Sequence, residues 1–406
     1  MQFLLAATLA LSHAQRSAID GIVERVMHDD RIAGLSVGIA CAGGPLYLHG
    51  YGLRDVGRTL RADPYTLYRI GSVTKQFVAA LTLQGAEAGT IALETPLRQY
   101  VPSASPAVGR VTVEQLLDQT SGIGVDGIAT AEPGTGWSYS NANYALLDAI
   151  LERTTGRALP ALLRERIVEP LGLRSTGYGF VPQAANVARG YAWADGWNEV
   201  TPTADRSRIA GTMVSNVPDL LRWLEALRAG RVVSARSLAA MTASGRLLDG
   251  TPTHYGFGFF VADWFGYRAV EHPGFVDGFS ALDVLLLDDG LSVAILANAD
   301  AVDLVPLAKS LVAIVDRPRD PNLLAQISRP PENENLQITS DLKAILQTPG
   351  FARLGRLVAV EFVERSVVEG ATHDKYRVTF SGGTWWVTIA YRENGPIEAL
   401  TLSPIE

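Results

Sequence analysis

A long apolar segment that contains one serine and one lysine constrains this chain more than any other feature. From Tyr68 to Gly89, apolar residues recur at helix spacing, and Gly89 is a typical helix end. Ser72 and Lys75 are three residues apart and therefore share a helix face, with Ser72 near the N-terminus, where free N–H groups favour developing negative charge. Aliphatic neighbours disfavour the charge of Lys75, so its amine is able to take the serine proton. The segment predicts a serine nucleophile with a lysine base.

The spacing alone carries little weight, because a serine three residues before a lysine occurs twice in the 406 residues. The second copy, Ser340–Lys343, is typical of a helix cap followed by an exposed helix start. The surroundings distinguish the first copy. Lys75 is the only lysine before Lys309 in a chain that otherwise uses arginine, and it lies among aliphatic residues. An ordinary buried helix is the structural alternative.

A loop rich in glycine and proline, residues 132–144, leads into a predicted helix and carries further polar groups. Loops on a rigid scaffold commonly present catalytic side chains. Tyr139 is a candidate general acid or base if a neighbouring ammonium lowers its pKa, and Asn141 is a candidate donor to a substrate carbonyl. Taken alone, the loop favours the structural alternative, in which Tyr139 packs at the helix start and Ser140 or Asn141 caps the helix.

A third group of residues, Glu271–Phe275, ends a strand-like segment. Gly274 has no side chain and would allow a substrate backbone to approach the strand edge closely. A lone histidine such as His272, directly before a turn, is usually just a polar residue at a strand end. The segment is therefore a candidate substrate-binding strand only in combination with the other two segments.

Together the three segments resemble the motifs of the serine β-lactamase and penicillin-binding-protein superfamily. They are most similar to the branch that contains class C β-lactamases, D,D-carboxypeptidases, D-aminopeptidases and related esterases. The first motif is Ser72–Lys75, and the second is Tyr139–Asn141. The third motif is His272–Gly274, where the family more often has Lys-Thr-Gly or His-x-Gly.

Two further segments support the resemblance. Residues 116–123 are similar to the family's Leu-Leu-x-His-Thr-Ser-Gly loop, with Gln119 in place of the usual histidine. Residues 210–220 are similar to a later family segment. The similarity extends from about Ile19 to Val315 in the family's order, and several motifs in sequence are more specific than any one of them.

The resemblance implies a role for each matching residue. Ser72 would form a covalent acyl-enzyme, Lys75 would activate it, and Tyr139 would shuttle protons. Asn141 would orient Lys75 and the substrate. The backbone N–H groups of Ser72 and Phe275 would form the oxyanion hole, where the loss of one donor typically costs ~10²–10³ in rate. The family mechanism implies no cofactor.

The third motif departs from the family pattern in a way that bears on the substrate. His272 takes the place of a lysine on the edge strand that holds the substrate, and histidine gives a weaker, pH-dependent charge. Pro273 removes a hydroxyl and an N–H where relatives hold a carboxylate. We therefore expect an esterase or D-amino-acid peptidase that acts on a small ester or amide. The alternatives are a D,D-carboxypeptidase or weak β-lactamase, and a non-catalytic protein that binds peptidoglycan fragments or a partner.

Strand-like segments lie near both ends of residues 15–316, with helical segments between them. Two strands joined at Gly43–Gly44 come first, and four more lie within residues 255–298. Residues 95–230 are predicted to form an all-helical subdomain, and Val302–Val315 a closing helix. The expected fold class is α/β: a β-lactamase-like sandwich in which helices flank a central antiparallel sheet.

Residues 317–335 are rich in proline and polar residues and lack periodicity, which predicts a linker. Beyond it, residues 336–406 are predicted to form a small α+β accessory domain with a helix at about Ser340–Leu346. Glycine-containing turns separate four strand-like segments in this domain. These segments are Leu357–Val363, Tyr376–Phe380, Trp385–Tyr391 and Ile397–Leu402.

The N-terminus bears on the location of the protein. Phe3–Leu11 is apolar and is followed by a small-x-small pattern that ends at Ala14, which predicts a signal peptide over residues 1–14 and an exported protein, periplasmic or secreted. A frayed or mis-started N-terminus is the alternative. The apolar segment is shorter than the ~20 residues that span a bilayer, so we expect no stable membrane anchor.

Composition restricts the partners. A net charge of −7 and a pI near 5.5 leave no basic footprint for nucleic acid. The lone Cys41 excludes an intrachain disulfide, and none of the six histidines pairs with another at metal-ligand spacing, so no metal site is indicated. The expected partner is a small-molecule or peptide substrate.

Overall fold

The computed structural model divides the chain into two units, Met1–Pro321 and Asn322–Glu406, which are described separately. The predicted linker, residues 317–335, and residues 1–10 of the predicted signal peptide lie outside the described residues. The structural statements below concern residues 11–41, 44–124, 126–179, 186–200, 213–315, 346, 357–368, 371–380, 383–391 and 397–404.

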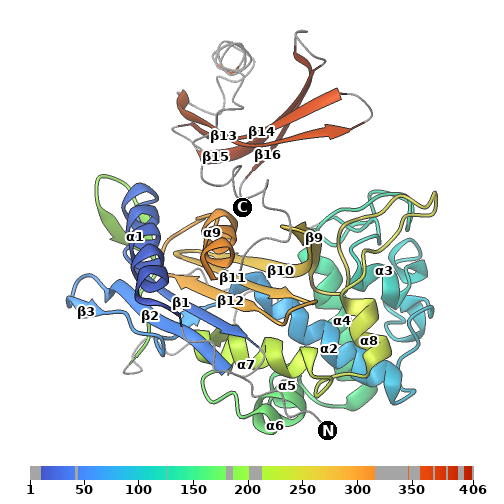
Figure 1. The fold of residues 1–406 in the computed structure, drawn as a ribbon. Coiled ribbons are helices and arrows are strands. Elements are labelled where there is room, and N and C mark those ends of the chain that lie inside the picture. Colours follow the sequence, from blue (N-terminus) through green and yellow to red (C-terminus); the bar gives the residue numbers. More distant parts are fainter. Residues whose placement is uncertain are drawn as a thin grey trace, which may run out of the picture. The chain divides into compact units, whose positions relative to one another are not determined.

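An antiparallel sheet of seven strands, in the order β3-β2-β1-β12-β11-β10-β9, forms the centre of the first unit (Figure 1). Its strands come from two distant parts of the sequence, which meet where β1 pairs with β12. This confirms the predicted sheet built from both sequence ends. The strands are β1 Gly34–Cys41, β2 Gly44–Asp55, β3 Leu60–Arg61, β9 Phe260–Trp264, β10 Tyr267–Val276, β11 Phe279–Leu286 and β12 Ser292–Ala297.

Helices cover both faces of this sheet (Figure 1). The helices α1 (His13–Asp29) and α9 (Val305–Val315) lie on one face, and α7 (Val217–Arg228) lies on the other. Because both faces are covered, every residue of β11 and β12 is buried, and these strands are apolar runs rather than alternating patterns. Gly38 lets α7 approach β1, since a Cβ there would lie 2.1 Å from a Val217 methyl carbon.

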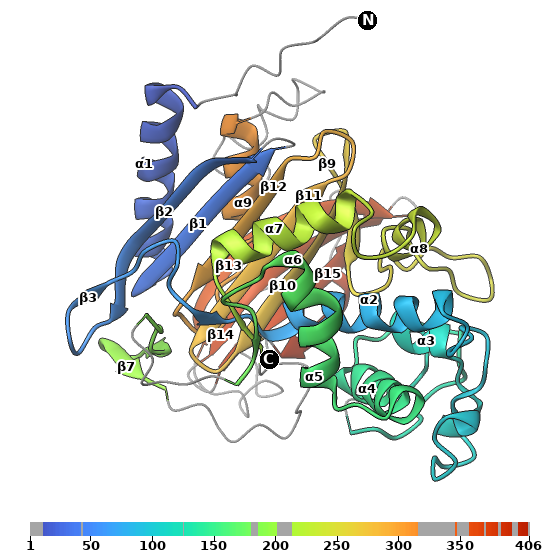
Figure 2. The ribbon, with the colours of Figure 1, turned by 90° about the horizontal axis from the view of Figure 1, so that it is seen from below.

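The remaining helices form a layer beside the sheet, in the part of the chain between β3 and β9 (Figure 2). Within residues 95–230, the chain also forms the short strands β5 to β8, of which β7 lies away from the helical layer, toward the β3 end of the sheet (Figure 2), so the expectation of an all-helical subdomain is wrong in detail. Strands of two or three residues are too short to leave an alternating pattern in the sequence. The helices are α2 Thr74–Glu87, α3 Val113–Leu117, α4 Asn141–Thr155, α5 Leu159–Leu163, α6 Glu169–Leu171 and α8 Ala235–Met241, with strands β4 Tyr68–Arg69, β5 Gly177–Tyr178, β6 Tyr191–Trp193, β7 Trp197–Glu199 and β8 Met213–Ser215.

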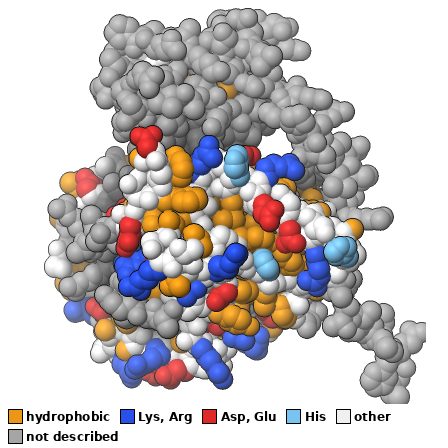
Figure 3. Space-filling view, turned by 90° about the vertical axis from the view of Figure 1, so that its left-hand side faces the viewer, with side chains coloured by type: hydrophobic (Ala, Val, Ile, Leu, Met, Phe, Trp, Pro, Cys, Tyr) orange, Lys and Arg blue, Asp and Glu red, His pale blue; other side chains and the backbone are white. Residues whose placement is uncertain are grey.

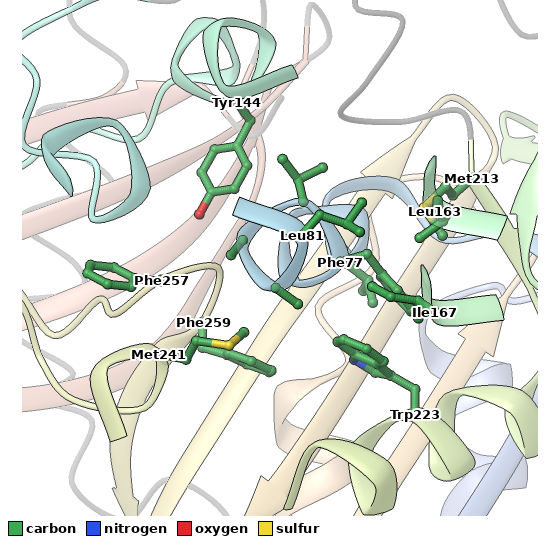
Figure 4. Packing of buried hydrophobic residues seen from close by; sticks show 14 of the residues in the cluster. Phe77, Leu81, Tyr144, Leu163, Ile167, Met213, Trp223, Met241, Phe257 and Phe259 are labelled. Carbon is green, nitrogen blue, oxygen red and sulfur yellow. The ribbon is translucent and has the colours of Figure 1, made fainter. Parts of the chain in front are cut away.

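Helix α2 is the centre of the core that joins the helical layer to the sheet. Eleven of its 14 residues are buried. Phe77 stacks on Trp223 of α7 with ring centroids 4.1 Å apart, and Leu81 lies among side chains of the neighbouring elements (Figure 4). Burial of a Phe or Leu side chain contributes about 1.5–3 kcal/mol. The helix that carries the predicted catalytic lysine is therefore also the best-buried helix of the unit.

The expected strand at Tyr255–Val261 is replaced by a loop over most of its length. Strand β9 begins only at Phe260, and Tyr255 forms an isolated bridge with it. Two glycines explain the difference, because a Cβ at Gly256 would lie 2.2 Å from the Met241 carbonyl oxygen and one at Gly258 would lie 2.9 Å from the Lys75 oxygen. The segment turns to pack on the start of α2 instead of extending the sheet.

The second unit contains an antiparallel sheet in the order β13-β14-β15-β16, at the four positions expected from the sequence. Buried side chains alternate along the central strands, at Tyr376, Val378, Val387 and Ile389, as expected for a sheet with one core face. Of the predicted helix Ser340–Leu346, only Leu346 is described, and it is helical. The strands are β13 Leu357–Val368, β14 Ala371–Phe380, β15 Gly383–Tyr391 and β16 Ile397–Pro404.

Helix α1 begins at His13 with a capping box between Ser12 and Gln15, so the predicted cleavage point after Ala14 lies within its first turn. Removal of residues 1–14 stays a prediction. Among the described residues, no helix has both the length and the apolarity to cross a membrane. On the face that carries α1, basic, acidic and histidine side chains are interspersed with apolar ones (Figure 3).

Candidate active site

Ser72 lies in a single 3₁₀ turn, Gly71–Val73, immediately before α2 rather than in the α-helix itself. Gly71 has φ +51°, a backbone conformation that favours glycine, and a Cβ at this position would lie 2.7 Å from the Phe275 backbone nitrogen. The turn is therefore pressed against the end of β10. This contact places the backbone of the first motif beside that of the third.

Lys75 lies one turn further, with its amine directed at the serine. Its Nζ lies 3.0 Å from Ser72 Oγ and donates to Asn141 Oδ1 at 2.7 Å. The side chain is fully buried, and burial lowers the pKa of Lys75 to about 7. The amine is therefore deprotonated in a substantial fraction of molecules at neutral pH, which allows it to accept a proton.

Tyr139 completes the group around Ser72. Its ring lies 4.6 Å from Lys75 Nζ, and its hydroxyl interacts with the Ser72 side chain. Burial raises the pKa of Tyr139, and the interaction with Ser72 opposes this rise only in part. From the sequence, a proton-transfer role for Tyr139 depended on a pKa lowered by a neighbouring ammonium, and that condition is not met because the effect of burial dominates. Tyr139 is a protonated phenol at rest.

Gly274 lies against the chain's own backbone. A Cβ there would lie 2.0 Å from the Ile70 carbonyl oxygen and 3.1 Å from the Ser72 nitrogen. We expected this glycine to admit a substrate backbone, but it admits the turn that carries the nucleophile. Strand β9 pairs with β10 only as far as Glu271, so in the described structure the Ser72 turn lies beside the segment of β10 that includes Gly274 and Phe275.

His272 is buried, with an exposed fraction of 1%. Its Nε2 lies 3.0 Å from the Tyr255 hydroxyl and its Nδ1 lies 2.6 Å from the Pro273 carbonyl oxygen. Burial and the neighbouring Lys75 lower the pKa of His272 to about 3. The pH-dependent positive charge expected from the sequence is therefore absent at physiological pH, because desolvation disfavours the imidazolium.

The structure adds polar residues that the motifs do not include. Gln76 donates to Asp283 of β11 and accepts a 2.8 Å hydrogen bond from the Trp223 indole, and all three side chains are fully buried. Burial raises the pKa of Asp283 to about 7. The signal in the sequence is one ionisable residue, an aspartate, inside a mostly apolar strand. Gln119 and Tyr255 also belong to the site, and only the replacement of histidine by Gln119 was visible beforehand.

In the part of the chain that the structure describes, no group of three or more His, Cys, Asp or Glu side chains has the arrangement of a metal site. The polar groups that meet at the site are a hydroxyl, an amine, a phenol and an amide, from Ser72, Lys75, Tyr139 and Asn141. A hydroxyl with an adjacent neutral amine is the arrangement of a nucleophile and its base.

A half-buried serine beside a fully buried lysine, between an antiparallel sheet and a helical layer, defines a serine hydrolase of the β-lactamase type. The family description Beta-lactamase matches residues 19–315, which is well over half of the chain, and the protein belongs to this family. Among its relatives are Esterase EstB of Burkholderia gladioli (27% identical, over 66% of this chain and 89% of the relative) and D-aminopeptidase of Gluconobacter oxydans strain 621H (26% identical, over 82% and 68%).

Solved structures show the same fold. The D-amino acid amidase of Ochrobactrum anthropi SV3 superposes with a TM-score of 0.67 at 22% identity, over 75% of this chain and all of that chain. The octameric penicillin-binding protein homologue of Pyrococcus abyssi also gives a TM-score of 0.67 at 21% identity, over 95% of this chain and 99% of that one. These findings confirm the predicted fold class and the resemblance, and they identify the protein as a serine hydrolase.

Proposed function

We propose that this serine hydrolase cleaves a small ester or amide through an acyl-enzyme on Ser72, and that the substrate has no carboxylate next to the reacting bond. The observation that carries the proposal is the 3.0 Å approach of Lys75 Nζ to Ser72 Oγ in a site that lowers the lysine pKa to about 7. A buried amine with this pKa is suited to general-base catalysis near neutral pH.

In the acylation step, Ser72 Oγ attacks the substrate carbonyl carbon while Lys75 Nζ accepts its proton. The carbonyl electron pair moves to oxygen, where the N–H groups of Ser72 and Phe275 stabilise the charge. When the oxyanion collapses, the bond to the leaving oxygen or nitrogen breaks, and the leaving group takes the Tyr139 proton. The Lys75 ammonium then returns a proton to Tyr139, so that both groups are restored.

In the deacylation step, water enters where the leaving group departed and attacks the acyl carbon. Its proton passes to the Lys75–Tyr139 pair, the bond to Ser72 Oγ breaks, and Oγ recovers a proton from the same pair. Asn141 accepts a hydrogen bond from Lys75 throughout and keeps the amine directed at Ser72. The cycle consumes one water and requires no other co-reactant.

The third motif supports a neutral substrate. His272 is uncharged and buried, and Pro273 has neither an N–H nor a hydroxyl to offer a carboxylate. Holding a carboxylate in a desolvated site requires a paired charge or several donors. The relatives named an esterase and a D-aminopeptidase fit this reading, since both names describe cleavage of an ester or of an amide next to a free amine.

The decisive experiment is turnover of p-nitrophenyl esters, D-amino-acid amides and nitrocefin by the wild type and by Ser72→Ala. We expect ester or amide turnover that falls roughly 10⁴–10⁶-fold in the variant. A fluorophosphonate probe should modify Ser72, as read by mass spectrometry. Equal turnover by the two proteins would contradict the mechanism, and a folded wild type that neither turns over nor reacts would point to a binding protein. Preference for nitrocefin would favour a β-lactamase.

Export is a separate proposal that rests on residues 1–14. N-terminal sequencing of the protein recovered from its native source should give Gln15 as the first residue. An intact Met1 on the active protein would contradict it.

A further inference from the structure

Gln119 occupies an unusual position between the second and third motifs. It is fully buried and has φ +66°, a left-handed conformation that is uncommon and unfavourable for a residue with a side chain. Such a conformation persists only where the surrounding structure compensates for it. The hydrogen bonds of Gln119 show what compensates.

Gln119 binds the residues on both sides of Tyr139. Its backbone carbonyl accepts from the Ser138 N–H, and its side-chain Oε1 accepts from the Ser140 N–H, each at 3.0 Å. Oε1 also accepts from Asn143 at 2.6 Å. Two adjacent anchors leave the backbone at Tyr139 little freedom, so the direction of the phenol toward Ser72 depends on Gln119.

The orientation of the Gln119 amide follows from these contacts. A backbone N–H can only donate, so Oε1 must face Ser140, and Nε2 must face the opposite way. On that side the amide interacts with the Tyr255 hydroxyl, but Nε2 forms no full hydrogen bond with any described residue. Gln119 therefore turns an otherwise unpartnered N–H toward the oxygen of Tyr255, and this contact is weaker than its hydrogen bonds to the second motif.

The same reasoning orients Tyr255 toward the third motif. The Pro273 carbonyl can only accept, so the 2.6 Å contact requires a proton on Nδ1 of His272. Nε2 of the neutral ring is then an acceptor, and the Tyr255 hydroxyl donates to it at 3.0 Å. The result is a directed chain from the Gln119 amide through the Tyr255 hydroxyl to His272.

We propose that Gln119 is a positioning residue that holds Tyr139 over Ser72 and, through Tyr255, directs a hydrogen bond to His272. This inference rests on the proposed function of Tyr139 as the proton donor to the leaving group. It also explains why a glutamine can serve in a loop where the family usually has histidine. The amide oxygen accepts from the second motif, and the amide nitrogen faces the tyrosine that binds the third motif.

The test compares Gln119→Met with the matched variant Gln115→Met. Gln115 lies on α3 and caps that helix through Thr112, and none of its side-chain hydrogen bonds in the described structure reaches the motifs, so its loss should lower stability and leave kcat unchanged. Gln119→Met should lower kcat for the preferred ester about 10²-fold with little change in KM, because a misplaced donor slows the chemical step more than binding. It should also shift the ¹⁵N resonance of His272 Nε2 to higher frequency, as expected when Tyr255 no longer donates steadily to it.

Tyr139→Phe separates this inference from the proposed function. If Tyr139→Phe turns over as fast as the wild type, the proposed acid fails. If Tyr139→Phe is slow while folded Gln119→Met retains the wild-type kcat and His272 resonance, the positioning inference alone is overturned. Should Gln119→Met fail to fold, the isosteric Tyr255→Phe tests the second half of the chain. It should lower kcat about tenfold and shift the same resonance, and an unchanged kcat and resonance would overturn the inference.

Discussion

The start of α2 and the end of β10 meet at Ser72, but they contribute in different ways. The α2 side supplies side chains that change protonation: a hydroxyl and an amine 3.0 Å apart, with a phenol above them. The β10 side supplies backbone groups and a buried, neutral histidine. In the proposed mechanism, proton transfer therefore belongs to the helix side, and geometry belongs to the strand side.

This contrast has a physical origin. Lys75 and His272 are both buried and cationic when protonated, and burial lowers the pKa of each. The reference pKa of lysine is high, so the lowered value falls near 7, where the amine can exchange a proton. That of histidine starts near neutral, so the lowered value falls near 3, where the ring remains neutral. The same desolvation makes one residue reactive and the other inert.

The largest effect should come from the helix side. Lys75→Met removes the base while keeping a long apolar side chain in the core, and we expect kcat to fall roughly 10²–10⁴-fold. The measurement is kcat for an activated ester, together with the melting temperature. If Lys75→Met retains more than a tenth of the wild-type kcat, proton transfer does not belong to this side of the site.

On the strand side, Gly274→Ala tests geometry without altering any titrating group. The added Cβ would lie 2.0 Å from the Ile70 oxygen and would force the Ser72 turn away from β10. We expect kcat to fall about 10²-fold, because small displacements of a nucleophile are costly. Gly177→Ala, where nothing lies within 4 Å, is the control and should behave as wild type. A fast Gly274→Ala enzyme would show that the contact with the turn is dispensable.

The pH dependence separates the two sides directly. Lys75 accepts a proton only when neutral, so kcat/KM should rise with pH up to about 7 and fall about tenfold per unit below it. His272→Asn should leave the midpoint of this limb in place, since the wild-type ring does not titrate in this range. If the midpoint of the pH profile moves by a full pH unit or more in His272→Asn, the titration belongs to the strand side of the site and not to Lys75.

The last prediction concerns stability and is expected to leave catalysis least affected. Burial raises the pKa of Asp283 to about 7, so the folded protein keeps a proton that the unfolded chain releases near pH 4. The free energy of unfolding of the wild type therefore falls as pH rises from about 4 to 7. Asp283→Asn has no carboxyl to ionise, so at pH 8 it should avoid this loss of a few kcal/mol in the free energy of unfolding. Denaturant unfolding at pH 5 and pH 8 measures this difference, with a substitution of the exposed Asp263 of β9, Asp263→Asn, as the control. An equal gain at both pH values would contradict the prediction.

Much of the architecture was predictable because local patterns carry it. The apolar periodicity of α2, the hairpin glycines and the strands at both ends of residues 15–316 reflect local backbone preferences and burial. The order of the three motifs was visible for the same reason, since each is a continuous run of residues. The short strands β5 to β8 were missed, because two or three residues do not reveal a period.

The chemistry of the site was less predictable than its residues. The motifs named Ser72, Lys75, Tyr139 and Asn141 as candidates, and the structure brings these side chains together, but the raised pKa of Tyr139 and the neutral state of His272 were not foreseen. The function of Gly274 was also misjudged, because the group that occupies the space above it lies some 200 positions earlier in the chain.

The sequence by itself determined which groups were available for reaction and which segments would become strands and helices, because both are properties of neighbouring residues. Only the tertiary structure decided their ionisation and their partners. Segments distant in the chain pack together and exclude water. This packing desolvates Lys75, His272 and Asp283, and it also creates the two anchors that Gln119 provides. No local pattern records how much water such packing removes.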